Sequence, residues 1–535
     1  MNRSLKSLLL ALIPLVFLSC ENEVNLDVLK HQTQQEQDSS EITTDKTNTA
    51  DSTENASSND DNKTPVTSET LDGVLGSGIT PTKPIISYFV QSPLQEVDQT
   101  TIDEIKSRSK YDAREDELVT EIKDQGSYGT CWAHAAASVI ESSMIKKKLA
   151  TKEKVNLSEE FLVYYQYCRV PAPIGGLPAD ASAFPTHLTN QILQEGGLPS
   201  ELMNALFAWV GVVDETKCSG ITEASILNID TQKAYENQAT LVTGAATIPA
   251  NVGIENMENM KNAIDGMKEA IARYGSVATA YNVRPYYDNK YFNSQSYGQY
   301  YYDSTPGTNH AITIIGWADD FNEFGNGKSD TPAGAWLVRN SYGDDWGDEG
   351  YCWLSYYDTT IALRAVYYDV TDVKEYDNNY QYDDASRWSE NIGTGSSMEL
   401  QTANIYTAQG DEDLKAVQFG MVYPNRDYDI DIYLGVKDSP TSGQRVTTVE
   451  GSPLPQGRHT IRLSTPIQLK KGERFSVVVT YRGVNEGETP SAEYESAKNT
   501  LPGQSFYRLN SSYEWNDMHA EGKGNLRLKV FTKNR

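Results

Sequence analysis

The sequence predicts an α+β fold followed by an all-β sandwich, and three observations support this prediction. Between residues 108 and 371, helical patterns come first and strand patterns second, which favours two subdomains with a cleft between them over an alternating α/β sheet. From 372 to 535, short alternating runs recur between turn-forming residues, as in an antiparallel β-sandwich. A chain of 535 residues is also too long for one ordinary domain.

The predicted helices lie in the first folded unit. The most distinct one opens at Cys131 and runs to about Ala150, with small residues early and three lysines in its last turns. A second helix follows residues 157–160, where Ser158 is suited to the N-cap position. Further helices are expected at 186–196 and 257–274.

Strands are predicted where apolar and β-branched residues run together. In the first unit these runs are 276–280, 310–317 and 334–339. In the second unit they are 414–422, 428–434, 458–463, 474–481 and 525–532. Residues 71–107 contain a short strand-like run at 85–91 and several prolines, and we interpret them as a linker or a short pro-segment.

The first 20 residues are typical of a signal peptide. A positively charged start precedes an apolar run at 8–18 that is too short to span a bilayer comfortably. The run ends at Ser19-Cys20, which resembles a bacterial lipobox, so Cys20 is expected to be lipidated and to become the N-terminus. The alternative is an ordinary signal peptide with a cysteine there by chance. We therefore expect a bacterial cell-envelope protein, anchored by lipid, in the outer membrane and exposed at the surface.

Residues 21–70 are expected to be a disordered tether. From Glu21 to Glu69 the chain has twelve acidic residues, three lysines and no aromatic residue. Such a segment cannot bury enough apolar surface to offset the entropy lost on ordering.

The charge of the chain restricts its partners. A formal net charge of −28 argues against nucleic acid, because a phosphate backbone would be repelled. No pair of histidines stands at metal-ligand spacing, so neither a metal nor another cofactor is expected. The membrane is expected to be contacted through the lipid alone.

The segment 123–133 carries the clearest chemistry. It places Cys131 at the start of a helix, where the helix dipole and free N–H groups favour the reactive thiolate. Gly126 and Gly129 allow the chain to turn tightly ahead of that helix. Gln125 can place a side-chain N–H beside the thiol and, with the Cys131 backbone N–H, form an oxyanion hole. The alternative is a small buried cysteine in an alanine-rich helix.

Two further segments extend this pattern. His310 lies in the segment 308–317 and begins its apolar run at 310–317, and Asn340 opens the segment 340–351. The order Gln, Cys, His and Asn, with these flanking residues, resembles the papain family of cysteine peptidases over roughly residues 108–370. A His at the start of an apolar strand could otherwise belong to the core.

The resemblance implies a role for each of these residues. Cys131 attacks the scissile carbonyl as a thiolate, and His310 takes up the proton and later gives it to the leaving amine. Asn340 fixes the His tautomer, and Gln125 stabilises the oxyanion. The implied function is hydrolysis of peptide bonds in proteins or peptides through a thioester acyl-enzyme, on a two-subdomain papain-like fold.

The resemblance also implies substrate-binding residues. Gly175 and Gly176 match the family's segment that binds the substrate backbone, and Pro178 lies on the wall of the second subsite. Ala280 is expected near the floor of that subsite. Trp346 is expected to floor the pocket just beyond the scissile bond.

The sequence departs from the family at two positions. Tyr128 stands where the family usually has Cys, and the partner of that Cys is also missing, so one family disulfide is absent. Tyr342 replaces the usual Trp that shields the His–Asn bond. The resemblance implies one remaining disulfide, Cys168–Cys218, and a buried free thiol at Cys352.

A second histidine lies close to Cys131 in the sequence. His134 lies three residues after Cys131, and residues at this spacing are neighbours on a helix. It could be mistaken for the base, but the family usually has an inward-facing aromatic residue there. We therefore predict a packed or hydrogen-bonded core histidine.

The second unit resembles a lectin-like β-sandwich, of jelly-roll type, that accompanies some bacterial and archaeal papain-type peptidases. The matching segments are 375–383, 503–507, 515–517 and 525–526. Glycan binding by this unit is one hypothesis, and a stabilising or substrate-positioning accessory domain is the other. For the whole chain, the alternatives to a peptidase are an inactive papain-like adhesin, a carbohydrate-binding protein, or a transferase on the same fold.

Overall fold

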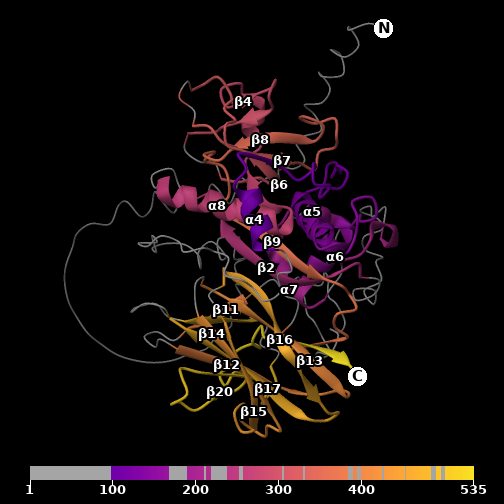
Figure 1. Ribbon diagram of the computed structural model, residues 1–535, viewed down its shortest axis with the longest axis vertical. Helices are drawn as coiled ribbons and strands as arrows, with labels where there is room; N and C mark the ends of the chain where they lie inside the picture. Colours follow the sequence, from indigo (N-terminus) through magenta and orange to yellow (C-terminus); the bar gives the residue numbers. More distant parts are fainter. Residues whose placement is uncertain are drawn as a thin grey trace, which may run out of the picture. The chain divides into compact units, whose positions relative to one another are not determined.

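The computed structural model describes residues 98–535 except 168–189, 195, 210–211, 219–237, 252–256, 304–306, 329, 331, 384–388, 394–398, 424–426, 452–453, 484–489 and 496–499. Within this part the chain forms an α+β unit followed by an all-β unit, as the sequence predicted (Figure 1). The signal peptide, the tether and the strand expected at 85–91 lie outside the described residues. The helices of the described part include none that is long and apolar enough to cross a membrane.

The helices of the described part are concentrated in the first unit (Figure 1). They are α4 (Gln99–Lys106), α5 (Cys131–Lys146), α6 (Glu159–Tyr167), α7 (Met203–Phe207) and α8 (Met257–Tyr274), with the 3₁₀ turns η3 (Asn190–Leu193), η4 (Pro199–Leu202), η5 (Glu215–Lys217) and η8 (Arg284–Tyr287). Helix α8 has the bounds predicted from the sequence. Of the helix expected at 186–196, the described part contains only the turn η3. The Ser158 hydroxyl accepts a hydrogen bond from the Phe161 N–H at 3.2 Å, so Ser158 caps α6 as predicted.

Helix α5 ends four residues earlier than predicted. Lys148 adopts a left-handed conformation (φ 59°), and its N–H donates to the Ile145 carbonyl at 2.8 Å. The Leu149 N–H donates to the Met144 carbonyl at 2.9 Å. These two bonds form a Schellman motif, which satisfies the last carbonyls of the helix and stops it. The alanines and other small residues of α5 are buried against strands β6 and β9 of the central sheet.

Helix α4 was not predicted, because it lies at the end of the proline-rich segment that we interpreted as a linker or pro-segment. Asp98 caps it by accepting from the Thr100 N–H at 3.3 Å. The helix packs on α8 through an ion pair between Lys106 Nζ and Glu269 Oε2 at 3.0 Å. The Arg273 guanidinium also donates to Gln99 Oε1 at 2.6 Å. Residues 99–106 are therefore held on the first unit.

The strands of the first unit belong to one large sheet. They are β1 (Lys110–Asp112), β2 (Leu241–Pro249), β3 (Val277–Tyr281), β4 (Phe292–Asn293), β5 (Gly298–Gln299), β6 (His310–Ala318), β7 (Ala335–Arg339), β8 (Tyr351–Ser355) and β9 (Arg364–Thr371). Strands β3, β6 and β7 correspond to the three predicted runs. Their order in the sheet is β2-β9-β3-β6-β7-β8-β5-β4, with β1 on β6.

The second unit contains the remaining strands of the described part. They are β10 (Asn378–Tyr380), β11 (Ser389–Gly393), β12 (Glu399–Thr407), β13 (Glu412–Met421), β14 (Asp427–Leu434), β15 (Gln444–Gly451), β16 (Gly457–Leu469), β17 (Arg474–Arg482), β18 (Ser491–Glu495), β19 (Ser505–Arg508), β20 (Asn516–Asp517) and β21 (Lys529–Asn534). One layer is the row β10-β21-β13-β16, and the other is the sheet β15-β14-β17-β12-β19-β20. Apolar side chains of both layers form one buried core, in which Phe419 packs on Tyr428 at 4.9 Å. The sandwich architecture was predicted correctly.

Strand β21 begins later than predicted. Residues 525–528 pair with the segment 493–495 instead of continuing the long sheet, since the Arg527 N–H donates to the Glu493 carbonyl at 3.1 Å. The Glu495 N–H donates to the Asn525 carbonyl at 2.9 Å. The predicted run is therefore split between two partners.

The two units share one continuous sheet. Strand β16 of the sandwich pairs with β2 of the first unit, with Gly457 opposite Ala246 and Arg458 opposite Ala245. A Cβ atom at Gly457 would lie 2.3 Å from the Ala245 carbonyl oxygen, so this close approach requires glycine. The row of β10, β21, β13 and β16 thereby extends the sheet of the first unit.

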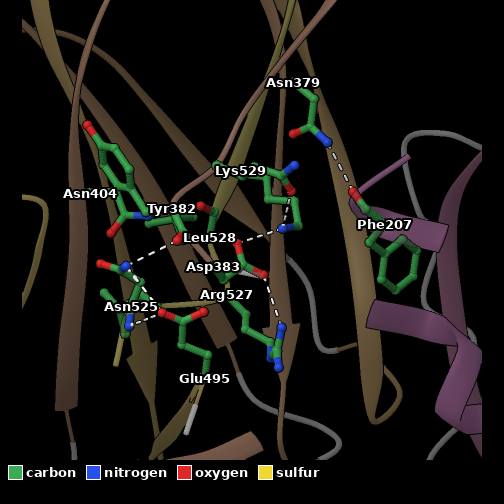
Figure 2. Close-up of polar contacts among 12 residues, drawn as sticks. Phe207, Asn379, Tyr382, Asp383, Asn404, Glu495, Asn525, Arg527, Leu528 and Lys529 are labelled. Atoms are coloured by element: carbon green, nitrogen blue, oxygen red, sulfur yellow. Dashed lines mark hydrogen bonds and ion pairs between the residues drawn. The ribbon is translucent and has the colours of Figure 1, made fainter. Parts of the chain in front are cut away.

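Side chains reinforce this junction. Trp209 and Phe531 pack at 5.2 Å between ring centroids and belong to a buried cluster that spans both units. The Asn379 amide donates to the Phe207 carbonyl at the end of α7, at 3.1 Å (Figure 2). Next to this contact, Figure 2 shows Asp383 of the sandwich between the cations Arg527 and Lys529.

Candidate active site

The segment before α5 places Cys131 at the first turn of the helix. Gly126 has a positive φ of 61° and its N–H donates to Asp124 Oδ1 at 2.8 Å, which closes a tight turn. The Gly129 N–H donates to the Leu193 carbonyl at 2.8 Å, and a Cβ atom at Gly129 would lie 3.0 Å from the Gln194 carbonyl oxygen. This packing fixes the backbone just before the thiol.

The Cys131 side chain is partly exposed and lies against strand β6. The Ala311 N–H donates to Cys131 Sγ at 3.4 Å. An N–H donor and a helix N-terminus both stabilise negative charge on sulfur. Because Ala311 follows His310 directly, this bond also brings the thiol to the residue that the sequence predicts as its base.

His310 is buried and lies at the start of β6, beside the end of β7. Its Nε2 atom is 2.7 Å from Oδ1 of Asn340. Asn340 follows the last residue of β7 and is anchored by its own N–H, which donates to the Gly350 carbonyl at 3.0 Å. Burial is the main cause that lowers the pKa of His310 to about 4, and the His134 ring adds to this, whereas the bond to Asn340 acts in the opposite direction. Burial therefore favours the neutral form of the ring.

Tyr342 lies over the His310 ring. The two rings stack with centroids 4.4 Å apart and 23° between their planes. The Tyr342 hydroxyl is 3.1 Å from Nδ1 of His310, which is the ring nitrogen not bound by Asn340. The sequence predicted that this tyrosine would cover the histidine, but it gave no indication of the hydroxyl contact.

Gln125 is buried next to the same loop. Its Oε1 atom accepts from the Ser341 hydroxyl at 2.6 Å, and its Nε2 atom donates to the Tyr128 carbonyl at 2.7 Å. The Gln125 backbone N–H donates to the Ser341 carbonyl at 2.9 Å. These three bonds hold the Gln125 amide in a fixed orientation beside the loop.

The predicted substrate-binding residues are only partly within the described residues. Trp346 is buried and meets the Tyr342 ring edge-on, with centroids 5.8 Å apart. Its other neighbour is Tyr286, which stacks on it at 4.9 Å. Ala280 is buried on β3, opposite Ala311 in the register with β6. Residues 175, 176 and 178 lie outside the described residues.

His134 makes a bond within its own helix, as predicted for a packed histidine. Its Nδ1 atom is 3.0 Å from the Thr130 carbonyl oxygen. Burial of the ring lowers the pKa of His134 to about 4, although the residue retains some solvent exposure. It is therefore a neutral group on the helix that carries Cys131.

The remaining cysteines are partly accounted for. Cys352 is a buried free thiol on β8, which confirms the prediction, and burial raises its pKa. Cys218 is partly buried beside the core of the first unit. Cys20 and Cys168 lie outside the described residues, so the lipidation and the Cys168–Cys218 disulfide stay predictions.

This geometry agrees with the family match. A model of the papain family of cysteine proteases matches residues 107–368. Residues 107–368 belong to the papain family. A model of a lectin-like domain matches residues 379–532. We refer to these two parts below as the papain-family domain and the lectin-like domain.

Two plant enzymes illustrate the relatives of the papain-family domain. It is 29% identical over 245 residues to the oryzain gamma chain of Oryza sativa subsp. japonica. It is 28% identical over 244 residues to the thiol protease aleurain of Arabidopsis thaliana. Each match covers 45% of this chain and 53% of the relative, so the chain spans about half the length of either relative.

Two solved structures of Cwp84 resemble this chain over both domains. Cwp84 is described as a clostridial cysteine protease and as a surface layer associated protein of Clostridium difficile. The form after propeptide cleavage superimposes with a TM-score of 0.62 at 21% identity, covering 80% of this chain and all 100% of the other. The structure of its cysteine protease and lectin-like domains gives a TM-score of 0.61 at 21% identity, covering 84% and 92%. The predicted fold, papain-like followed by lectin-like, is thereby confirmed.

Proposed function

We propose that this chain is a cysteine peptidase that hydrolyses peptide bonds in proteins or peptides. The observation that supports it most directly is the bond of 2.7 Å between His310 and Asn340, with the sulfur of Cys131 held 3.4 Å from the next N–H along β6. A neutral buried histidine with a fixed tautomer beside a thiol at a helix N-terminus has the chemistry of an activated nucleophile. The papain-family match adds an independent reason.

In the proposed mechanism, Cys131 transfers its proton to Nδ1 of His310 and attacks the scissile carbonyl carbon. The carbonyl π electrons move to oxygen, and the oxyanion accepts hydrogen bonds from Gln125 and from the Cys131 backbone N–H. Collapse of this intermediate expels the amine, which takes the proton from His310, and leaves a thioester on Cys131. Water, deprotonated by His310, then attacks the thioester and releases the carboxylic acid and the thiol.

Asn340 is proposed to orient the imidazole. Its Oδ1 atom accepts from His310 Nε2 and also from the Ser341 N–H at 2.8 Å, so the amide oxygen is held in place. This directs Nδ1 of the ring to the thiol side, which is the third-group role of a catalytic triad.

The decisive test is Cys131→Ala. Hydrolysis of a fluorogenic peptide should fall by at least about a thousandfold, because a triad member normally supplies several orders of magnitude. His310→Ala should have the same effect. His134→Phe is the control: His134 lies on the helix that carries Cys131, but its ring bonds to the Thr130 carbonyl, so this variant should keep its activity. Activity above about one percent of wild type in purified Cys131→Ala protein would contradict the proposal.

The lectin-like match favours a second candidate, an inactive papain-like adhesin or carbohydrate-binding protein. Titration with an irreversible thiol-peptidase inhibitor separates the two. Stoichiometric labelling of Cys131 supports the peptidase, whereas no labelling at Cys131 favours the adhesin. Glycan contact by the lectin-like domain is compatible with either function.

We further propose that a lipid on Cys20 anchors the chain at the bacterial cell surface. Residues 21–70 would be the tether and residues 71–107 a linker or pro-segment, followed by the units 108–371 and 372–535. The acidic composition of the tether and the surface-layer association of Cwp84 support this location. Cys20→Ala should release an active enzyme from the membrane fraction. Retention of that variant after a salt wash would contradict the lipid anchor.

A further inference from the structure

Both ring nitrogens of His310 are engaged by side chains of one loop. Nε2 lies 2.7 Å from Asn340 Oδ1, and Nδ1 lies 3.1 Å from the Tyr342 hydroxyl. In the proposed mechanism Nδ1 is the nitrogen that receives the thiol proton. The Tyr342 hydroxyl therefore contacts the nitrogen that accepts the Cys131 proton in the first step.

The direction of each bond follows from its partners. The Ser341 N–H can only donate, and it donates to Asn340 Oδ1 at 2.8 Å, so this atom is the amide oxygen. An oxygen can only accept, so His310 Nε2 carries a hydrogen. In the neutral ring Nδ1 then has a free lone pair, and the Tyr342 hydroxyl is the donor of their bond.

The hydroxyl is held in this position by the packing of Tyr342. Its ring lies between the His310 ring, at 4.4 Å, and the edge of Trp346, at 5.8 Å. Its backbone forms a β-bridge with Asp124, and the next residue, Gly343, has a φ of 77° and donates to the Lys123 carbonyl at 3.2 Å. The tyrosine is thus fixed from both sides.

We propose that Tyr342 is a positioning residue whose hydroxyl stabilises the neutral, proton-accepting form of His310 and so sets the pH range in which the Cys131–His310 ion pair exists. The inference rests on the proposed function. A hydroxyl that donates to Nδ1 favours the neutral ring. When Nδ1 takes the proton from sulfur, the hydroxyl must rotate to become the acceptor, or its hydrogen bond must break. The S–H bond breaks, the electron pair stays on sulfur, and the N–H bond forms.

The other titratable groups facing the His310 ring come from two elements. Helix α5 contributes Cys131 and His134, and β3 contributes Tyr281, whose ring centroid is 6.1 Å from that of the histidine. Burial lowers the pKa of His134 to about 4 and raises that of Tyr281, so both are neutral from pH 5 to 9. In this range, changes in the ion pair can be assigned to Cys131, His310 and the Tyr342 hydroxyl.

Removing the hydroxyl should favour the ion pair. In Tyr342→Phe the ring still covers His310, but the donor to Nδ1 is gone. The basic limb of kcat/KM should move to higher pH by about one unit, the usual effect of one hydrogen bond on a protonation equilibrium. Tyr342→Trp, which introduces the residue usual in the family, should shift the limb in the same direction, because indole has no hydroxyl.

The experiment measures, from pH 5 to 10, both peptide hydrolysis and alkylation of Cys131 by iodoacetamide. Tyr286→Phe is the matched control. It removes the hydroxyl of a tyrosine that stacks on Trp346 at 4.9 Å, and it should leave the basic limb of hydrolysis where it is in the wild type. In the Tyr342 variants, the basic limb of hydrolysis should shift upward with KM changed less than twofold, because expulsion of the amine needs the His310 proton. Alkylation should stay fast at high pH in every variant, because the thiolate remains when His310 loses that proton.

Two results would overturn the inference. A basic limb of Tyr342→Phe that superimposes on the wild type, or that moves to lower pH, would show that the hydroxyl does not favour the neutral ring. If Cys131 of the wild type showed no pH-dependent alkylation and no hydrolysis occurred, the proposed function would fail as well. Wild-type hydrolysis with unshifted Tyr342 variants would refute the inference alone.

Discussion

Two regions of the molecule, the candidate site and the Asp383 cluster of the lectin-like domain, differ in how their buried polar groups are paired. In the papain-family domain, Asn340 and Trp346 each have a buried nitrogen, Nδ2 and Nε1, without a hydrogen-bond partner among the described residues. In the lectin-like domain, the buried carboxylate of Asp383 bonds to Lys529 Nζ at 2.6 Å and to Arg527 Nη1 at 3.2 Å (Figure 2). Both cations and the carboxylate are almost fully buried there.

The difference separates two uses of burial. A buried ion pair whose members are saturated by one another is costly to break but has no chemistry to offer. A buried amide or indole with an unused N–H is ready to meet a group that arrives later, such as a substrate. The buried charges of the Asp383 cluster thus have a structural role, whereas the unpaired nitrogens of Asn340 and Trp346 lie around the candidate site. Three predictions test this contrast.

The largest effect is expected for Asp383→Ala. It leaves Arg527 and Lys529 buried without their carboxylate, and breaking a buried pair in this way costs about 3–5 kcal/mol. Urea unfolding in the Cys131→Ala background measures the loss without autolysis. The specific activity of the folded fraction, measured with an active Cys131, should be unchanged.

Arg445→Ala is the control for this prediction. Arg445 pairs with Asp431 at 3.6 Å on the exposed side of the same domain, and such pairs contribute less than about 1 kcal/mol. If Asp383→Ala cost no more than Arg445→Ala, the buried cluster would not hold the lectin-like domain together.

Gln125→Ala is expected to show the opposite profile. Loss of an oxyanion donor should lower kcat by about 10- to 1000-fold, with a much smaller change in the free energy of unfolding than for Asp383→Ala. Stopped-flow kinetics and urea unfolding give the two quantities. Ser341→Ala removes only the hydroxyl that holds Gln125 Oε1 and should have a weaker effect on kcat. An unchanged kcat in Gln125→Ala would exclude the residue from the oxyanion hole.

The smallest effect concerns a buried histidine of the lectin-like domain. His459 Nε2 lies 2.8 Å from the Pro455 carbonyl oxygen, and burial lowers the pKa of His459 to about 4. Because the unfolded chain, with a pKa of about 6.5, takes up this proton first, stability is lost as pH falls from about 6.5 to about 4. Replacing His459 by Gln should make this loss shallower by up to about 1.4 kcal/mol per pH unit.

Unfolding in urea at several pH values measures that slope. A slope in His459→Gln equal to that of the wild type would show that His459 takes up its proton in the folded state as readily as in the unfolded chain.

Much of the candidate site could be predicted because local patterns encode it. The flanks of Cys131 indicate the start of a helix, those of His310 the start of a strand, and those of Asn340 a loop. The structure brings the three residues together. The Tyr342 hydroxyl could not be predicted in the same way. Its effect depends on how the Tyr342 ring is oriented on the His310 ring, and this orientation is set only by the folded loop.

The fold was predicted less completely where contacts join distant residues. The pairing of β16 with β2 places Gly457 opposite Ala246, and no alternation pattern in either strand identifies its partner. Helix α4 was missed because prolines dominate the segment before it, while its stability depends on Glu269 and Arg273 of α8. The early end of α5 depends on the left-handed conformation of Lys148, which is unusual for lysine.

The glycine at the domain junction has a consequence for engineering. Gly457 lies where any Cβ atom would collide with the backbone of β2, so this position of the junction between the two domains tolerates no side chain. The lectin-like domain is therefore not an exchangeable module on a hinge. A chimera that grafts a different sandwich onto this protease would need a glycine at the same register, or the strands would part and expose an open sheet edge to aggregation.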